Sequence, residues 1–410
     1  MANSFRKYNG RKDKKAIQRI WQECGWITDE KREKEALDQF LKASSCWVFD
    51  MDGSAEALSI GTASRFLHTN TELSLAAVTA VNASRVARNQ GAASGTLLHL
   101  LADQAAAGAQ VSGLGIFEQG FYDRLGYGNG PYEHWVRFDP AWLSDLGKPR
   151  VPVRLGASDW KEIHEARLAR RKQHGAVDLL PPEITKSEME WPKNVFGLGY
   201  RENGVLTHFF VAHCDEVESG PYTVNWMVYQ SIGQFKELMA LIRGLGDQVR
   251  SFRMREPRDI QLQSLLRKPF QLYQITANSK NPSRSNAVAY WQLRILDVPA
   301  CVAAVRTANP LEFNLILSDP IQSQVPDDAA WRGCGGEYTI TFGSTSSATA
   351  GHRPDLPTLS ASVNDFTRFW MGAASAEVLA GVGSFEGPEE LLTALDESLK
   401  LPSPTPDWDY

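Results

Sequence analysis

The sequence predicts an α+β protein with mixed sheets that is divided into more than one domain. Its 410 residues exceed what a single hydrophobic core usually holds. Extended apolar runs alternate with amphipathic segments, and the opening order is helix, hairpin, strand, helix, strand. The content of 43% hydrophobic and 22% charged residues is that of an ordinary globular protein.

The composition also limits the partners and the compartment. The net charge of −5 argues against nucleic-acid binding, and the one basic stretch, "RKYNGRKDKK", leads into a predicted helix over 13–24 whose lysines face water. No apolar run is long enough to cross a bilayer, and the first residues are too polar for a signal peptide. The odd, scattered cysteines indicate a reducing compartment, with neither disulfides nor a zinc site. We therefore expect a cytoplasmic protein without membrane or nucleic-acid partners.

The first segment runs to about Leu146. After the helix, an Asp-Gly pair in "MDGS" predicts a hairpin between two strands, which a β-capable run at 72–83 follows. The stretch 95–108 has apolar residues at helical spacing and ends at Gly108. A short buried strand at 110–117, a helical turn at 118–128 and a strand at 132–138 complete the segment.

The second and third segments repeat mixed patterns. The second, about 151–290, opens with a charged helix at 158–175 whose histidines, His164 and His174, we expect on a solvated face. The strands and helices that follow are predicted at 195–214, 222–231 and 232–246, before a loop-like break at 278–286. The third segment is predicted to begin with a strand and a helix at 290–305, followed by strands at 313–320 and 336–344. Two short helices at 362–383, with Asn364 or Asp365 as the N-cap, and a terminal helix at 387–399 complete it.

The turn "RNQGAASG" at 88–95 is the first candidate for chemistry. It has the pattern R-x-x-G-x-A, and its small residues would let the backbone approach a ligand at a helix N-terminus. Arg88 could add a charge-assisted contact to a phosphate. The same pattern would also suit an ordinary strand-to-helix connection.

The stretch "FYDRLGYG" at 121–128 is the second candidate. Phe121, Leu125 and Tyr127 can be buried while Gly126 and Gly128 stop the helix, which leaves Tyr122 free to point elsewhere. Aromatic packing with turn chemistry is the alternative interpretation.

Other catalytic patterns are absent from the sequence. It contains no G-x-S-x-G, no H-E-x-x-H and no complete dinucleotide fingerprint. His208 and His213 would face opposite sides of a strand, which disfavours a metal site. His99 and Asp103, four residues apart on a helix, are expected to form a surface pair.

Together, "VTAVNASRVARNQGAASGTLLHLL" and "GLGIFEQGFYDRLGYG" resemble the acetyl-CoA-binding core of the GNAT superfamily of N-acetyltransferases. The whole chain is similar to the enhanced intracellular survival (Eis) family. That resemblance implies an α+β fold of tandem GNAT-like mixed-sheet domains followed by a sterol-carrier-protein-like domain. The implied domains are a catalytic one at 1–148, a degenerate GNAT-like one at 149–288, and a sterol-carrier-like one at 289–410 whose C-terminus reaches the active site.

The resemblance also implies roles for single residues. Tyr122 matches the general acid of the family, and the terminal carboxylate on Tyr410 matches the general base. Phe117 and Glu118 would flank the cofactor near its acetyl group. The implied pantetheine contacts are the backbones of Val81, Asn82 and Ala83, and the implied pyrophosphate contacts are Arg88, Asn89, Gln90, Gly91, Ala92, Ala93 and Ser94.

The chain departs from the family pattern in four places. Asn89 and Gln90 stand where arginines are common, Arg85 where proline is usual, Phe117 in place of a small polar residue, and Tyr410 in place of phenylalanine.

The implied function is direct acetyl transfer from acetyl-CoA, without a metal, to a primary amine of a small cationic molecule. The family also forms hexamers, so a homo-oligomer is expected. Two alternatives stay open: a non-catalytic protein that holds an apolar ligand in its C-terminal domain, and a protein or peptide N-acetyltransferase.

Overall fold

The computed structural model describes residues 3–214 and 216–409. The chain forms two compact units. The first unit comprises Met1–Pro131, Gln173–Pro181 and Ala289–Tyr410, and the second comprises Tyr132–Lys172 and Pro182–Val288. The division into three domains by chain position, and the sterol-carrier-like character of the third, stay predictions.

A long mixed sheet organises the first unit. Its strands β4 and β5 run parallel, whereas the other pairs along it are antiparallel, so the predicted mixed sheet is confirmed. Its order in the described part of the chain is β1 (Ser4–Lys7), β2 (Ser45–Met51), β3 (Ser54–His68), β4 (Thr71–Ala83), β5 (Val111–Gly115), β15 (Trp291–Ile295) and β6 (Gly128–Asn129), with β9 (Val177–Leu179) pairing β3.

The predicted local structure of the N-terminal part is confirmed. The hairpin of β2 and β3 turns at Asp52 and Gly53, which both have positive φ angles, as an Asp-Gly turn requires. The first helix buries Ile17, Ile20 and Trp21. The helices of this part are α1 (Lys14–Glu23), α2 (Lys31–Lys42), α3 (Ala92–Ala106) and α4 (Gln119–Asp123).

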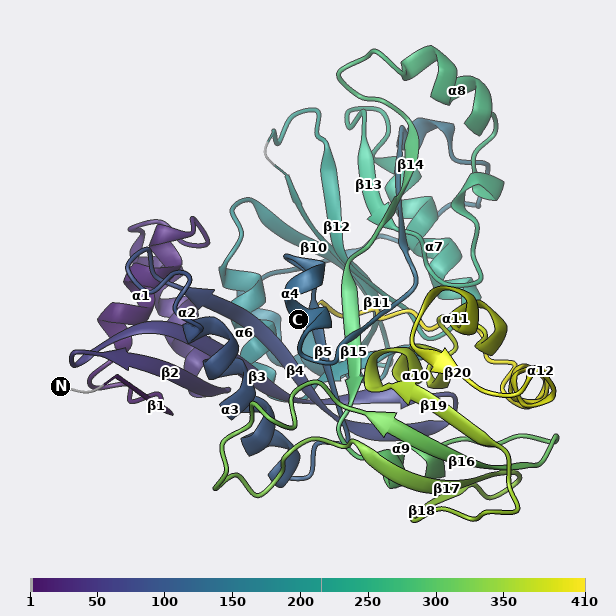
Figure 1. The fold of residues 1–410 in the computed structure, drawn as a ribbon. Coiled ribbons are helices and arrows are strands. Elements are labelled where there is room, and N and C mark those ends of the chain that lie inside the picture. Colours follow the sequence, from purple (N-terminus) through teal and green to yellow (C-terminus); the bar gives the residue numbers. More distant parts are fainter. Residues whose placement is uncertain (1–2, 215, 410) are drawn as a thin grey trace. The chain divides into compact units, whose positions relative to one another are not determined.

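The C-terminal part of the chain completes the same unit. Figure 1 shows β15 beside β5, where Trp291 to Ile295 pair antiparallel with Gly115 to Val111. A further sheet follows in the order β18 (Ser347–Ala350), β17 (Gly336–Phe342), β16 (Leu311–Ser318), β19 (Thr358–Ser362) and β20 (Phe385–Glu386). Its helices are α9 (Val298–Ala303), α10 (Val363–Trp370), α11 (Ala376–Val382) and α12 (Glu389–Ser398).

The N-cap of α10 differs from the prediction. Ser362, not Asn364 or Asp365, caps the helix, because its side chain accepts a hydrogen bond from the amide of Asp365. Asn364 therefore lies inside the helix, and its side chain is available for other contacts.

The second unit repeats the strand succession of the first. Three antiparallel strands lead into a helix, α7, and then into a strand, β13, that is parallel to the third of them, β12. The sheet order is β14 (Arg284–Val288), β7 (Glu133–Phe138), β13 (Phe252–Arg255), β12 (Tyr222–Val228), β11 (Val205–Cys214), β10 (Val195–Glu202) and β8 (Val153–Leu155). The helices are α5 (Trp160–Leu168), α6 (Pro182–Glu190), α7 (Ile232–Gly244) and α8 (Pro269–Thr276).

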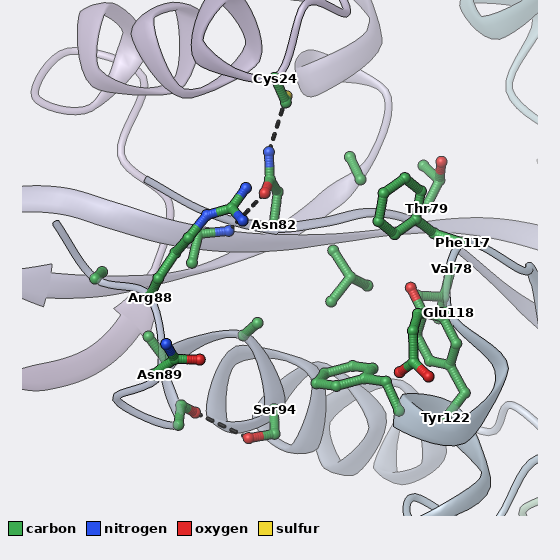
Figure 2. Close-up of a pocket in the computed structure, with 18 of the residues that line it drawn as sticks. Cys24, Val78, Thr79, Asn82, Arg88, Asn89, Ser94, Phe117, Glu118 and Tyr122 are labelled. Atoms are coloured by element: carbon green, nitrogen blue, oxygen red, sulfur yellow. Dashed lines mark hydrogen bonds between the residues drawn. The ribbon is translucent and has the colours of Figure 1, made fainter. Parts of the chain in front are cut away.

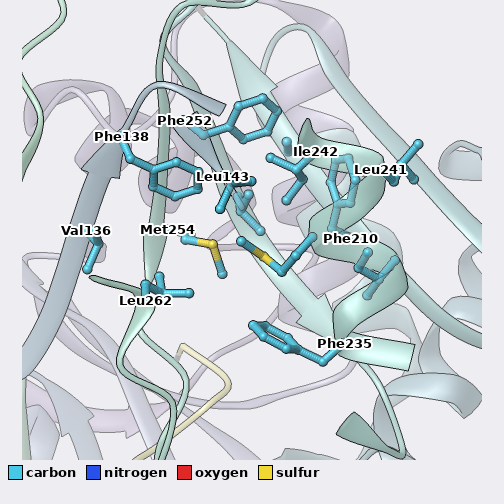
Figure 3. Packing of buried hydrophobic residues seen from close by; sticks show 14 of the residues in the cluster. Val136, Phe138, Leu143, Phe210, Phe235, Leu241, Ile242, Phe252, Met254 and Leu262 are labelled. Carbon is cyan, nitrogen blue, oxygen red and sulfur yellow. The ribbon is translucent and has the colours of Figure 1, made fainter. Parts of the chain in front are cut away.

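Apolar side chains of α7 form the core of the second unit against its sheet. Figure 3 shows Phe235 and Ile242 of α7 beside Phe210 and Phe252 of the strands. Such burial of large apolar side chains supplies the main driving force for folding. The predicted helix over 232–246 is confirmed by its buried face.

Two expectations about histidines were wrong. The charged helix at 158–175 does not place its histidines on a solvated face: His164 is buried on α5 against the Thr185 hydroxyl, and His174 is buried in the first unit. His99 does not pair with Asp103, because its ring donates to the carbonyl oxygen of Gly95 while Asp103 accepts from Lys7.

His68 and His174 form a buried pair beside the C-terminal stretch of the chain. Their ring centroids lie 5.0 Å apart, and His68 also stacks on Trp370. The Nε2 atom of His68 donates to the carbonyl oxygen of Trp370 at 3.0 Å, and the amide of Thr405 donates to the carbonyl oxygen of His174. Burial, reinforced by His174, lowers the pKa of His68 to about 3.

We predict that this histidine makes the protein less stable in acid. The unfolded chain takes up a proton near pH 6.5 but the folded chain only near pH 3, so stability is complete above pH 6.5 and falls as the pH drops toward 3. The free energy of unfolding should fall by about 2 kcal/mol more between pH 7 and pH 5 than in a His68→Gln variant. Urea titrations at both pH values measure this difference. Replacement of the exposed His352 by glutamine is the control, and equal pH slopes for the protein and H68Q would contradict the assignment.

Candidate active site

A cavity of about 800 Å³ opens in the first unit at the end of the pairing between β4 and β5. The two strands are paired from Leu75–Val111 to Val78–Leu114. Beyond Val78 the strand β4 continues to Ala83, still paired with β3, whereas β5 ends at Gly115. The edge of β4 that faced β5 is therefore left without a strand partner there, and it lines the cavity.

A bulge bends β4 at the mouth of this opening. The register of β3 and β4 shifts between Leu58 and Ile60, and Ala80 has a φ of +51°. Alanine rarely adopts that conformation, and bulges with such residues are common next to functional sites. Ala80 lines the cavity with its neighbours Thr79 and Val81.

The turn before α3 has the geometry of an anion site. Asn89 and Gly91 have φ angles of +61° and +73°, and the helix begins at Ala92. The first amides of α3 have no carbonyl partner within the helix, and they lie at its positive end. Because a side chain at Gly91 would meet nothing within 4 Å, its backbone conformation, and not lack of space, favours glycine there.

Packing explains other small residues of the turn. A side chain on Gly95 would come within 2.2 Å of the Phe5 ring, and Ala92 is buried in a cluster with Phe49, Ala57 and Ala87. The nearby core is enough to explain why Gly95 is small, and it also limits the size of Ala92, which lines the cavity as well.

The structure brings nearly all the predicted site residues to this one cavity. Figure 2 shows Arg88 and Asn89 at one end and Phe117, Glu118 and Tyr122 at the other. Among the described residues, Gln90 was predicted for the site but does not line the cavity: its side chain is exposed and donates to the carbonyl oxygen of Val86. Tyr410 lies outside the described residues. The predicted residues that line the cavity are Val81, Asn82, Ala83, Arg88, Asn89, Gly91, Ala92, Ala93, Ser94, Phe117, Glu118 and Tyr122.

Tyr122 reaches the cavity from α4. Its side chain is only 6% exposed, and its ring packs edge-on against Phe121 and Tyr127. Burial, together with the nearby Glu118 carboxylate, raises the pKa of Tyr122 to about 12. No described residue hydrogen-bonds to its hydroxyl group, which leaves that group able to serve a ligand.

The basic and acidic side chains that line the cavity do not pair with one another. No described acidic side chain pairs with Arg88, which is exposed at the turn. Arg124, one residue after α4, donates from Nε to the carbonyl oxygen of Gly120 at 3.2 Å, and its guanidinium forms no ion pair with a described residue. Glu118 is the acidic lining residue, and it caps α4 by accepting from the amide of Gly120.

Sequence reasoning missed several lining residues. Cys24 and Trp26 follow α1 and are brought in by the fold, and Asn82 donates to the Cys24 sulfur at 2.9 Å. No local signal marks them. Arg124 could have been predicted from the sequence, because it lies within "FYDRLGYG", two residues after Tyr122.

Side chains from the C-terminal part hold α4 and the turn after it. Arg294 of β15 donates to the carbonyl oxygen of Leu125 and pairs with Asp319, and both partners of that pair are fully buried. Gln292 donates to the carboxylate of Asp123 at 2.6 Å. Asn364 of α10 donates to the carbonyl oxygens of Asp123 and Tyr127 at 2.8 and 2.9 Å.

These contacts also explain the glycines of "LGYGNG". Gly126 has a φ of +82°, and a Cβ atom there would lie 2.0 Å from Nη1 of Arg294. A Cβ atom at Gly128 would lie 2.3 Å from the carbonyl oxygen of Asn364. The prediction for these glycines was that they stop the helix; the structure adds that they leave room for Arg294 and Asn364, which hold the helix.

Neither a metal site nor a membrane span is visible in the residues that the structure describes. His, Cys, Asp and Glu side chains form no group of three or more there that could hold a metal ion. No helix within 3–214 or 216–409 combines the length and the apolar character that a bilayer crossing needs.

We predict that Arg294 and Asp319 are strongly coupled. Arg294→Met leaves a buried carboxylate without its cation, which should cost about 3 to 5 kcal/mol of unfolding free energy. In an Asp319→Asn background the same change should cost at least about 1 kcal/mol less. Urea denaturation of the single and double variants measures the coupling.

The exposed pair of Arg332 and Asp327 offers the control, since Arg332→Met should cost less than about 1 kcal/mol. Additive costs for Arg294→Met and Asp319→Asn would show that the buried pair does not act as a unit.

Comparisons with known proteins agree on the fold. No family model matches the sequence, and no curated protein does. Among solved structures, a "Probable N-Acyltransferase" from Enterococcus faecalis V583 matches with a TM-score of 0.81 and 17% identity over 100% of both chains. A GCN5-related N-acetyltransferase from Kribbella flavida matches with a TM-score of 0.74 and 18% identity over 100% of this chain and 99% of that one. Eis1 from Mycobacterium abscessus has the same TM-score, 0.74, at 16% identity over 100% of both chains. The chain described here therefore has, over its whole length, the fold of GCN5-related N-acetyltransferases and of Eis1.

Proposed function

We propose that this protein is an acetyl-CoA-dependent N-acetyltransferase that acts on a primary amine of a small cationic molecule. The observation that carries the proposal is the single cavity that joins the open edge of β4, the start of α3 and the hydroxyl end of Tyr122. These three features suit the pantetheine arm, the pyrophosphate and the thioester of one acetyl-CoA molecule. The fold shared with N-acetyltransferases supports the same assignment.

The donor would be held mainly by backbone groups. The pantetheine arm carries amides, and the edge of β4 at Val81 to Ala83 that has no strand partner offers backbone groups in the extended form that such an arm needs. The amide of Ala83 already donates to Oδ1 of Asn82 at 2.8 Å, so the other backbone groups of this edge would make the contacts. The first amides of α3 would bind the pyrophosphate at the positive end of the helix. Arg88 would add a charge-assisted contact.

The chemistry needs a proton for the leaving group. The neutral amine nitrogen attacks the thioester carbonyl carbon, and the carbon–sulfur bond breaks as the amide forms. The thiolate that leaves takes a proton from Tyr122, whose raised pKa of about 12 keeps the phenol protonated at neutral pH. The amine nitrogen loses a proton to a base, the base releases it to solvent, and the Tyr122 phenolate regains a proton from solvent. The products are the acetylated amine and free CoA.

The acceptor would bind near the acidic end of the cavity. The exposed Glu118 carboxylate lies at the Tyr122 end, opposite Arg88, and favours a cationic group there. We propose the carboxylate of Tyr410 as the base that accepts the amine proton. Support for this role comes from the resemblance to the Eis family.

Two measurements test the activity. Calorimetry should show acetyl-CoA binding in the micromolar range, and turnover should appear with small polyamines or aminoglycoside-type amines. Release of free thiol together with the mass of the acetylated product measures the turnover. Turnover with peptide amines alone would move the proposal to a peptide acetyltransferase. Absence of CoA binding would favour a non-catalytic binding protein instead.

We predict that Tyr122→Phe and deletion of Tyr410 each lower kcat by about 10² to 10³, because the first removes the phenolic proton and the second moves the terminal carboxylate back by one residue, to Asp409. CoA affinity should stay within about threefold, since neither change removes a phosphate contact. Steady-state kinetics with the preferred amine and calorimetry with CoA measure both effects. Tyr132→Phe, at an exposed tyrosine of the second unit, is the control. Full activity in both site variants would overturn the assigned mechanism.

A further inference from the structure

Three arginines lie side by side on one face of the sheet of the second unit. Arg137 of β7 stands directly opposite Arg253 of β13 on one side and directly opposite Arg284 of β14 on the other. Side chains of directly opposite residues project to the same face of a sheet, about 5 Å apart. Val136 and Phe138 pack in the core with residues of α7, so the arginines lie on the face of the sheet that points away from α7. We call Arg137, Arg253 and Arg284 the arginine row.

The charges of the arginine row have no anionic partner in the part of the chain that the structure describes. Arg253 and Arg284 are exposed, and neither forms an ion pair there. Arg137 donates to uncharged groups, which are the hydroxyl of Ser251, the carbonyl oxygen of Lys280 and the side-chain oxygen of Asn281. Burial, together with Arg284 and Arg253, lowers the pKa of Arg137. Like charges directly opposite each other destabilise a sheet, so an anion bound here would relieve a repulsion.

Two carboxylates near the arginine row already have cations of their own. Glu133, on the same face of β7, pairs with Arg255 at 3.2 Å. Glu216 pairs at 2.8 Å with Lys280, the residue whose carbonyl oxygen accepts from Arg137. The row is therefore open to a negatively charged group of another molecule.

The arginine row ends at an open edge of the sheet. Within the described residues, β14 is the last strand of the sheet order and pairs only with β7. Arg284 to Ala287 are exposed, and the backbone of the strand forms no hydrogen bond with described residues beyond that pairing. The strand contains no proline, and its register with β7 has no bulge, although such devices usually protect an edge. This edge can therefore accept a further strand.

We infer that β14 binds an extended acidic segment of a partner protein, which adds to the sheet as a strand and places a carboxylate opposite Arg284. In such a strand, the side chains opposite Arg284 and Asn286 project to the face of the arginine row, because directly opposite residues share a face. Acidic residues at alternate positions would thus make a charge-assisted contact with Arg284 and lie in the field of Arg137 and Arg253.

The open edge favours a peptide over other anions. A nucleic acid or a free polyphosphate could use the charges of the arginine row, but neither has a backbone that pairs with a strand. Backbone hydrogen bonds supply affinity in strand addition, and complementary charge selects the partner. The inference is independent of the proposed function, because β14 and the arginine row belong to the second unit whereas the cavity belongs to the first.

Fluorescence anisotropy on the full chain with labelled peptides tests the inference. A peptide of about eight residues that alternates glutamate and threonine should bind in the micromolar range. The same peptide with lysine in place of glutamate should bind at least about tenfold more weakly. An added strand turns every second amide toward β14, so N-methylation of one alternate set of amides should weaken binding about tenfold, and of the other set by less than about threefold.

Arg284→Gln should weaken binding of the glutamate peptide about tenfold. Arg154→Gln is the matched control, because Arg154 is an exposed arginine on β8, the opposite edge strand of the same sheet, and its loss should change the affinity by less than about twofold. Equal losses in R284Q and R154Q, or equal binding of both N-methylated peptides, would refute strand addition at β14. A peptide affinity that falls as the protein concentration rises would show that a second copy of the chain covers the edge, and it would refute the inference as well.

Discussion

The buried guanidinium of Arg294 is the constraint on which the candidate site depends. A charge without solvent is costly unless it is paired and hydrogen-bonded, and here Asp319 and the carbonyl oxygen of Leu125 meet that need. Asp319 in turn accepts from the amide of Cys334 at 2.9 Å, so the pair is fixed from two sides. A Cβ atom on Gly126 would lie 2.0 Å from Nη1 of Arg294, so the contact with Leu125 needs a residue without a side chain there. One ion pair thus links the C-terminal part to the turn that follows Tyr122.

Because of this ion pair and its neighbours, the position of the site residues depends on distant segments of the first unit. The helix α4 is only five residues long, too short to be stable alone, and its position comes from outside contacts. Gln292 and Arg294 on β15 and Asn364 on α10 supply polar contacts. Ile321 and Val325 pack in the same hydrophobic cluster as Tyr122. The described residues that line the cavity lie before residue 125, but the groups that hold α4 in place lie beyond residue 290.

Features set by neighbouring residues can be predicted from the sequence, whereas features set by contacts between distant segments cannot. Local features are predictable, since the Asp-Gly hairpin and the helix α3 follow from neighbouring residues, and the position of Tyr122 at a cavity follows from the family resemblance. Ala80 could not be predicted, because a bulge in β4 depends on its register with β3. The burial of His164 and the pairing of β15 with β5 are set by tertiary contacts that no periodicity records. The sequence pattern explained the small size of Gly95 by room for a ligand, yet the Phe5 ring accounts for it, since it would lie 2.2 Å from a Cβ atom there.

Contacts from distant segments also allow the short stretch around α4 to present opposite charges to one cavity. Glu118, Tyr122 and Arg124 lie within seven residues, and they offer a negative charge, a protonated phenol and a positive charge to the same cavity. Such a short helix could not hold opposite charges in fixed directions by its own hydrogen bonds. The caps and contacts around it do so, from Glu118 at its start to Arg294 at its end. A shift of the Arg294 contact would therefore move the Tyr122 hydroxyl group and the Arg124 guanidinium together, because both are carried by the short stretch that ends at Leu125.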